Sequence, residues 1–381
     1  MHIKTLIVAV SCFMLLFMCC KQEDNMKKFE LKGNPMIVDK FTADPAPMVY
    51  DGVLYLYVGH DEYYEGQNSA SGGKEFNITE WLCYSTTDMK TWTDHGSVLK
   101  PTDFKWAVGE AWASQVVEKD GKFYYYTTVQ AGEPYNSKTV GVAVADNPLG
   151  PFTDARGTPL ITDDMTPNGP RGWWNDIDPT VFFDEEGTPW MSWGNGTCFL
   201  VKLKPNMIEL DGPIQILDLP NFMEGPWLHK HNGLYYLTYA SSGDEREMMH
   251  YATATDMEGT WTYRGALTGM AENSFTIHPG IIEYKGNWYL FYHNCEISGN
   301  GTLRSVCIDE VKFNSDGSIQ TVQQTKQGVA NVDYVDPADI AGNNSSPDPA
   351  KFTEKIDYSI SNAEIGGGAT RGGEAIENLH Y

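Results

Sequence analysis

The stretch EGPWLHKHNGLYYLTYASS, residues 224–242, combines a carboxylate, a Gly-Pro-Trp segment, an Asn-Gly turn and a run of alternating aromatic residues. A residue-Gly turn followed by period-2 alternation predicts a hairpin that enters a β-strand. The arrangement recurs in DGVLYLY (51–57), DGKFYYY (120–126), EGTPWMSW (186–193) and KGNWYLFY (285–292). The five turn glycines lie between 46 and 69 residues apart, so the chain repeats one unit five times.

A second motif follows the first at a distance. It occurs in STTDMKTWTDHGSVL (85–99), ADNPLGPFTD (145–154) and TATDMEGTWTYRGAL (253–267). Five units of about four short strands, without a long helical period, predict an all-β fold: a five-bladed β-propeller. We expect it to form one catalytic domain over residues 34–325. A β-sandwich also has many short strands, but it would not explain five copies of one ordered pair of motifs.

The composition limits the partners. The chain has 27 Lys and Arg against 51 Asp and Glu, which gives a formal net charge of −24. This field would repel phosphate backbones and anionic lipid, so we expect no nucleic-acid partner and no direct membrane binding. The 11 Trp and 21 Tyr fill a β core and also offer flat faces on which sugar rings can stack. We expect a monomer.

The N-terminus predicts export. Residues 1–20, MHIKTLIVAVSCFMLLFMCC, carry one Lys before an apolar run and end in two cysteines ahead of the polar KQEDN. This pattern resembles a bacterial lipoprotein signal with Cys20 as the acylated residue, and an ordinary secretory peptide is the alternative. We therefore expect a lipid-anchored protein of the cell envelope, in the periplasm or on the cell surface, or otherwise a secreted one. Residues 21–33 are interpreted as a linker.

One residue lies eight or nine positions before each turn glycine. These five residues are Asp44, Trp112, Asp178, Glu224 and His278. The first strand of each propeller blade lines the central axis, so equivalent offsets predict that these side chains meet at one mouth of the channel. Asp-Pro at the start of a strand can also be simple turn chemistry. Two Asp-Pro and one Glu-Gly-Pro at matched offsets favour a functional ring.

Three of these motifs carry a family resemblance. ADPAP, DIDPTVFFDEEGTPWMSWG and EGPWLHKHNGLYYLTY resemble glycoside hydrolase family 43, and with AWASQ they look most like its arabinoxylan-arabinofuranosidase and xylosidase branches. The resemblance covers residues 34–325. It implies a five-bladed propeller that cleaves arabinose or xylose units from plant polysaccharides with inversion. It further implies that Asp44 is the general base, Glu224 the general acid and Asp178 a carboxylate that orients the acid and raises its pKa.

The resemblance also implies substrate contacts and an ion. Arg304 matches an arginine that contacts substrate, Trp112 looks like a platform for a pentose ring, and Trp173 is interpreted as a wall of the pocket. His278 matches a histidine near an axial calcium ion, which would be structural, so no cofactor is required for the chemistry. The alternatives are a core role for His278 or Trp112, and neutralisation of the acidic mouth by Arg304.

The predicted function is exo-acting release of terminal α-L-arabinofuranose or β-D-xylose from arabinoxylan, arabinan or xylo-oligosaccharides. The alternatives are an endo-acting xylanase or arabinanase, a fructan-cleaving propeller that retains configuration, and a non-catalytic sugar-binding propeller. A binding protein needs no general base, so the presence of all three acids argues against the last. The tail, residues 326–381, is too short for a usual carbohydrate-binding module and is interpreted as a possible remnant of one.

Overall fold

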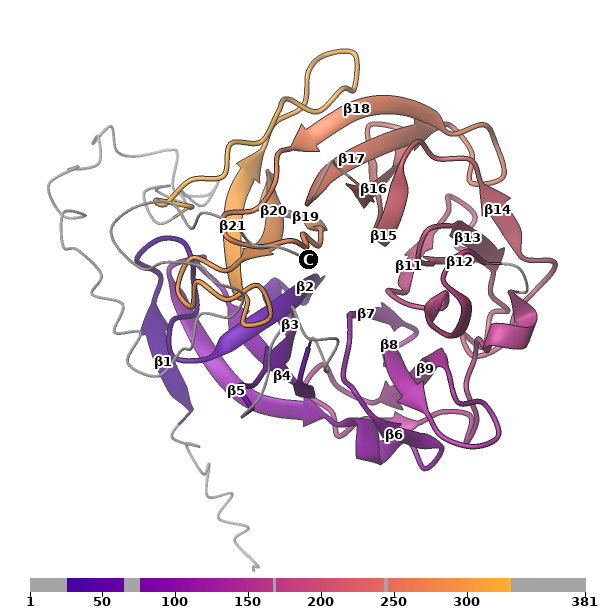
Figure 1. Ribbon diagram of the computed structural model, residues 1–381. Helices are drawn as coiled ribbons and strands as arrows, with labels where there is room; N and C mark the ends of the chain where they lie inside the picture. Colours follow the sequence, from indigo (N-terminus) through magenta and orange to yellow (C-terminus); the bar gives the residue numbers. More distant parts are fainter. Residues whose placement is uncertain (1–25, 65–75, 167–168, 243–245, 330–381) are drawn as a thin grey trace, which may run out of the picture.

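The computed structural model describes residues 26–64, 76–166, 169–242 and 246–329. Five sheets surround a central axis, and the strand that leads into each repeated glycine turn (β2, β7, β11, β15 and β19) lies nearest the centre (Figure 1). The prediction of an all-β, five-bladed propeller is confirmed. The predicted signal peptide with Cys20, and residues 330–381 of the predicted tail, lie outside the described residues.

The blades follow one another along the chain. Blade 1 consists of β1 (Lys27–Glu30), β2 (Phe41–Tyr50), β3 (Val53–Asp61), β4 (Ile78–Thr86) and β5 (Thr91–Leu99). Blade 2 consists of β6 (Ala107–Gly109), β7 (Ser114–Lys119), β8 (Lys122–Ala131), β9 (Lys138–Ala145) and β10 (Thr153–Asp154). Blade 3 consists of β11 (Thr180–Phe183), β12 (Pro189–Trp193), β13 (Cys198–Lys202) and β14 (Gln215–Leu217).

Blade 4 consists of β15 (Phe222–His231), β16 (Leu234–Ser242), β17 (Glu247–Ala254) and β18 (Thr262–Thr268). Blade 5 consists of β19 (Gly280–Tyr284), β20 (Asn287–Asn294) and β21 (Ser305–Val311). Among the described residues, three single 3₁₀ turns join the strands: η2 (Pro101–Asp103), η3 (Asp163–Met165) and η4 (Gly172–Trp174). Within the described ranges, no helix has the length and apolar character needed to cross a membrane.

The predicted hairpin turns form for a local reason. Asn232 and Gly233 both have positive φ, 46° and 80°, and the flanking His231 and Leu234 pair across the turn. Two consecutive left-handed residues match the twist of the strands that they join, and Asn and Gly tolerate that conformation best. Blade 3 differs, because Phe183 pairs with Pro189 across a longer loop.

The ring closes through the N-terminal segment. The Asn34 amide donates to Ile308 O at 3.0 Å, to Asp309 Oδ2 at 3.1 Å and to Thr325 O at 2.8 Å. It also accepts the Ile308 N–H at 2.8 Å, so one buried side chain links the N-terminus to blade 5. Leu31, Met36 and Val329 pack into the same apolar cluster between blades 5 and 1.

The structure adds contacts at both edges of the predicted catalytic domain. Residues 27–30, in the segment that the sequence predicts as a linker, form β1, which pairs antiparallel with β5 and extends blade 1. In the first residues of the predicted tail, Val329 is buried and the Lys326 carbonyl accepts the Asn34 N–H at 2.8 Å. The short polar KKFE segment of β1 has no alternating apolar pattern, which is why the sequence did not reveal it.

We predict that Asn34→Ala lowers the free energy of unfolding by about 2–3 kcal/mol, because it leaves buried backbone and carboxyl groups without their partner. Urea denaturation followed by tryptophan fluorescence measures the change. Asn206→Ala, at an exposed turn, is the matched control and should change stability by less than about 0.5 kcal/mol. Equal effects of the two substitutions would contradict a special role for Asn34.

Candidate active site

Two of the three predicted acids lie on kinked backbone. Asp44 and Asp178 have positive φ, 52° and 61°, and each precedes a proline. In β2 the pairing register shifts between Ala43 and Ala46, so Asp44 is the extra residue of a bulge. A bulge bends its strand and redirects the side chain, and Asp tolerates the left-handed conformation better than most residues.

Glu224 also lies at irregular pairing, with register shifts on both sides of it in β15, but its own backbone is not left-handed. Its neighbour Gly225 has φ 58° and precedes a proline, so Gly225 holds the position that Asp44 and Asp178 hold in their blades. Aligned on the proline, Glu224 therefore lies one residue before the position of the other two acids, although its offset of nine residues from the turn glycine equals that of Asp178. A Cβ at Gly225 would lie 2.9 Å from His278 Nδ1, so only glycine fits between the two blades without rearrangement.

Asp44 belongs to a buried ion cluster. Arg304 Nη1 donates to Asp44 Oδ1 at 2.9 Å, while Arg304 Nε and Nη2 donate to Asp61 at 2.9 and 3.0 Å. His293 Nδ1 lies 3.4 Å from Asp44 Oδ1. Burial raises the pKa of Asp44, and the Arg304 guanidinium acts in the opposite direction. Asp61 and His293 were missed from the sequence because each lies at the end of a second blade strand, outside the quoted motifs.

Glu224 is placed to hold a proton near neutral pH. Burial raises the pKa of Glu224 to about 7, the charge of Asp44 adds to this, and Arg304 and Arg171 oppose it. The Asn195 amide donates to Glu224 Oε2 at 3.2 Å. Asn195 lies just after β12 and had not been predicted as a site residue.

Asp178 connects three blades. Its backbone N–H donates to Thr128 Oγ1 of blade 2 at 2.8 Å, and its Oδ2 accepts the Gly225 N–H of blade 4 at 3.0 Å. Burial raises the pKa of Asp178 well above its usual range, and the charge of Glu224 raises it further. The bond from Gly225 acts in the opposite direction, because a backbone donor favours the ionised carboxylate.

His278 lies beside this group. Its Nδ1 is 4.0 Å from Asp178 Oδ2, and burial lowers the pKa of His278 to about 3, so the ring is neutral. Calcium takes six to eight oxygen ligands in proteins. In the part of the chain that the structure describes, no group of three or more His, Cys, Asp or Glu could hold a metal ion. The described side chains around His278 therefore do not fit a protein-ligated calcium site.

Aromatic rings flank the acids. The Phe76 ring lies 4.3 Å from the Arg304 guanidinium and makes an edge contact with Trp112 at 6.4 Å. Trp112 is half-buried, and Lys138 Nζ lies 3.6 Å from the centre of its ring. Trp173, on η4, is 55% exposed and stacks on Trp174. Trp112 thus lies next to the ion cluster, while Trp173 offers an exposed face.

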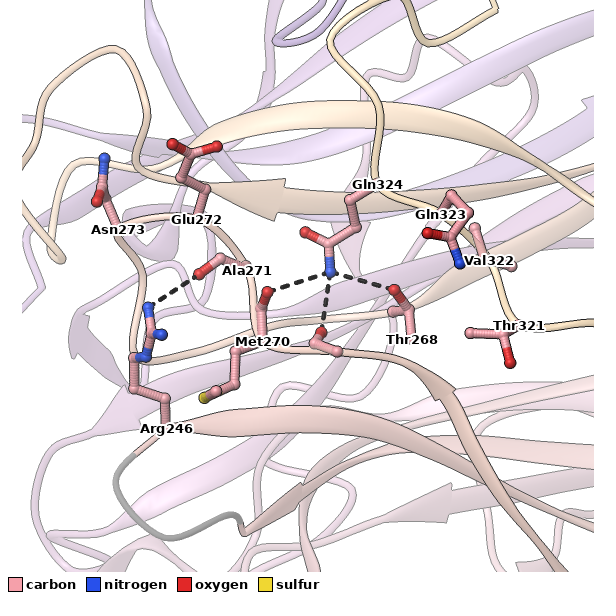
Figure 2. A pocket seen from close by; sticks show the side chains of 11 residues that line it. Arg246, Thr268, Met270, Ala271, Glu272, Asn273, Thr321, Val322, Gln323 and Gln324 are labelled. Carbon is pink, nitrogen blue, oxygen red and sulfur yellow. Dashed lines mark hydrogen bonds between the residues drawn. The ribbon is translucent and has the colours of Figure 1, made fainter. Parts of the chain in front are cut away.

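A separate, outer cavity of about 500 Å³ lies between blades 4 and 5 (Figure 2). Its walls come from Arg246 before β17, from the segment after β18 and from residues 321–324. The Gln324 amide crosses it and donates to Thr268 Oγ1 and to Gly269 O. None of the three predicted acids lines this cavity.

A five-bladed propeller with three buried carboxyl groups at one mouth has the architecture of a carbohydrate-cleaving enzyme. The sequence profile "Glycosyl hydrolases family 43" matches residues 33–319, most of the chain. The chain belongs to this family.

Named relatives are similar over most of their length. A xylosidase/arabinosidase of Bacteroides ovatus is 31% identical over 332 residues, which cover 76% of this chain and 97% of the relative. An arabinoxylan arabinofuranohydrolase of Bacillus subtilis is 30% identical, with 80% of this chain and 67% of the relative covered. A β-xylosidase/α-arabinofuranosidase from a compost metagenome, solved calcium-free with xylotriose, has a TM-score of 0.67 at 28% identity, covering 77% of this chain and 98% of its own.

We predict that Asp61→Asn lowers the free energy of unfolding by about 3–5 kcal/mol, because the buried Arg304 loses its two-point partner. Urea denaturation measures the loss. Asp146→Asn removes one partner of the exposed ion pair with Lys122 and should cost less than about 1 kcal/mol. A similar small loss for Asp61→Asn would show that Asp61 is dispensable to the cluster.

Proposed function

We propose that this protein is an inverting, exo-acting glycosidase that releases terminal α-L-arabinofuranose or β-D-xylose from arabinoxylan, arabinan or xylo-oligosaccharides. The observation that carries the proposal is the contrast between Asp44, paired with Arg304, and Glu224, whose pKa is raised to about 7. Two carboxyl groups whose environments differ in this way can serve as base and acid at one pH. The names of the Bacteroides relative and of the xylotriose-bound structure support a pentose substrate.

Asp44 is the proposed general base. Its carboxylate accepts a proton from a water molecule, and the water oxygen attacks the anomeric carbon from the face opposite the leaving group. The Arg304 bond orients the carboxylate and favours its ionised form. Inversion requires room for this water, with base and acid about 6.5–9.5 Å apart.

Glu224 is the proposed general acid. It gives its proton to the glycosidic oxygen as the bond from that oxygen to the anomeric carbon breaks. After each turnover, solvent returns a proton to Glu224 and removes one from Asp44. The Asn195 amide holds the Glu224 carboxyl group in place by its bond to Oε2.

Asp178 is proposed to position the acid. Its bond from the Gly225 N–H fixes the backbone next to Glu224 and favours the ionised form of Asp178. A negative charge on Asp178 would keep the proton on Glu224 at higher pH. Trp112, Arg304 and Trp173 are proposed to contact the substrate. Trp112 would line the pocket, and the exposed Trp173 ring would meet sugars outside it.

We predict that Glu224→Ala and Asp44→Ala differ in which substrates they slow. Without its proton donor, the enzyme should lose about 10²–10⁴-fold in kcat on a natural glycosidic bond, and much less on an aryl glycoside with an acidic phenol. Without the base, both substrates should become slow. p-Nitrophenyl α-L-arabinofuranoside and β-D-xyloside, compared with arabinoxylan oligosaccharides, provide the measurement.

Thermal unfolding of each variant is the control for folding. Equal losses on both kinds of substrate in Glu224→Ala, or an active Asp44→Ala, would contradict the assignment of roles. The first product offers an independent check on stereochemistry, because inversion of a β-xyloside releases the α anomer.

We predict that kcat/KM falls as the pH rises through about 7, since the free enzyme needs Glu224 protonated. Asp178→Asn removes a neighbouring negative charge, so the pKa of Glu224 should fall and this alkaline limb should move to lower pH. Profiles of kcat/KM between pH 4 and 10 measure the shift. A limb that stays in place would exclude Asp178 as a group that sets the proton affinity of the acid.

A further inference from the structure

Glu247 is a fourth carboxyl group near the proposed acid, and the mechanism above does not use it. It begins β17, and its backbone N–H donates to Phe275 O at 3.0 Å. Its Oε2 accepts the N–H of Ile277 at 3.1 Å, one residue before His278. The side chain therefore bridges blade 4 to the segment that leads into the inner strand of blade 5.

The direction of Glu247 differs from that of its neighbour. Arg246 points into the outer cavity, where its Nη1 lies 3.5 Å from Ala271 O (Figure 2). Successive side chains of an extended segment point to opposite sides. Glu247 accordingly turns toward Ile277 and the axis, close enough to Glu224, Asp178 and Asp44 for their charges to act on it.

The basic side chains of the cluster, Arg304, His293 and His278, do not neutralise Glu247. Arg304 bonds to Asp44 and Asp61, and His293 and His278 are neutral because burial lowers the pKa of each ring far below its usual value. Among the described residues, Glu247 takes part in no ion pair. An unpaired ionised carboxylate in such a place is costly, and a buried group escapes that cost by keeping its proton.

Glu247 receives less support for a charge than Asp44 and Glu224 do. Asp44 accepts a bond from Arg304, and Glu224 has the Asn195 amide and the field of Arg171. Burial raises the pKa of Glu247 well above its usual range, and the charges of the other three acids raise it further, against the single bond from Ile277.

We propose that Glu247 works as a neutral carboxylic acid that binds a hydroxyl group of the terminal pentose. Its Oε2 accepts from Ile277, and the O–H on Oε1 donates to the sugar oxygen. The residue is intermediate in burial, neither fully enclosed nor fully exposed. This inference rests on the proposed function for its ligand, but the protonation state of Glu247 can be tested without it.

The test compares two substitutions at one position. Glu247→Gln keeps an acceptor for Ile277 and an N–H donor for the sugar, so kcat/KM should stay within about threefold of the wild type. Glu247→Ala removes both, and kcat/KM should fall about 10- to 100-fold, mostly through KM. Glu272→Gln, at an exposed residue nearby, is the matched control and should have no effect. Equal damage from Gln and Ala would overturn the proposal, because an ionised acceptor cannot be replaced by an amide.

Two readouts do not depend on hydrolysis. Infrared difference spectra at pH 7 between the wild type and Glu247→Gln should show the carbonyl band of one protonated carboxyl group, and its absence would overturn the proposal. Calorimetry with L-arabinose and D-xylose should show weaker binding to Glu247→Ala than to Glu247→Gln. Equal binding by the two variants would also overturn it. A wild type that binds these sugars but cleaves no pentoside would refute the proposed function alone.

Discussion

The Arg304 guanidinium is the charge on which the site and the closed ring both depend. It is 4% exposed and joins Asp44 of blade 1 to its own blade 5, while Asp61 holds it from the other side. The backbone carbonyl of Arg304 also accepts the Thr42 N–H at 2.8 Å, so both the backbone and the side chain of Arg304 bond across the seam between blades 5 and 1. A buried arginine is tolerated only when its donors are satisfied. The seam between the first and last blades therefore places the proposed base and cannot open without breaking this cluster.

The three acids differ because their neighbours differ. Asp44 faces a guanidinium, Asp178 faces a backbone N–H, and Glu224 faces an amide. Each of these partners comes from a different blade from the acid that it holds. The rigid packing of blades thus sets the proton affinities, and a separate loop for each acid is not needed. Gly225 shows how closely the blades approach, since a Cβ there would meet His278.

The sequence predicted the features that depend on residues close together along the chain. Residue-Gly turns and period-2 alternation identified the blades, and Asp44 and Asp178 stood out because each precedes a proline at a similar offset from its turn glycine. It did not predict Asp61, Asn195 or Glu247. Asp61 ends β3, Asn195 follows β12 and Glu247 begins β17, and each acts through a contact with another blade. Such contacts leave no pattern along the chain.

The excess of carboxyl groups in the site can be explained by the charge of the transition state. A terminal pentose is neutral in the ground state, so the acidic mouth neither attracts nor repels it strongly. Cleavage passes through an oxocarbenium-like transition state with positive charge on the sugar ring. A cluster of acids with Arg304 as its close cation becomes complementary only at that stage. Fixed negative charge near the developing cation lowers the barrier without tightening substrate binding. Placing these acids close together also raises their pKa values. The raised pKa of Glu224, about 7, keeps this side chain protonated near neutral pH, as a general acid must be.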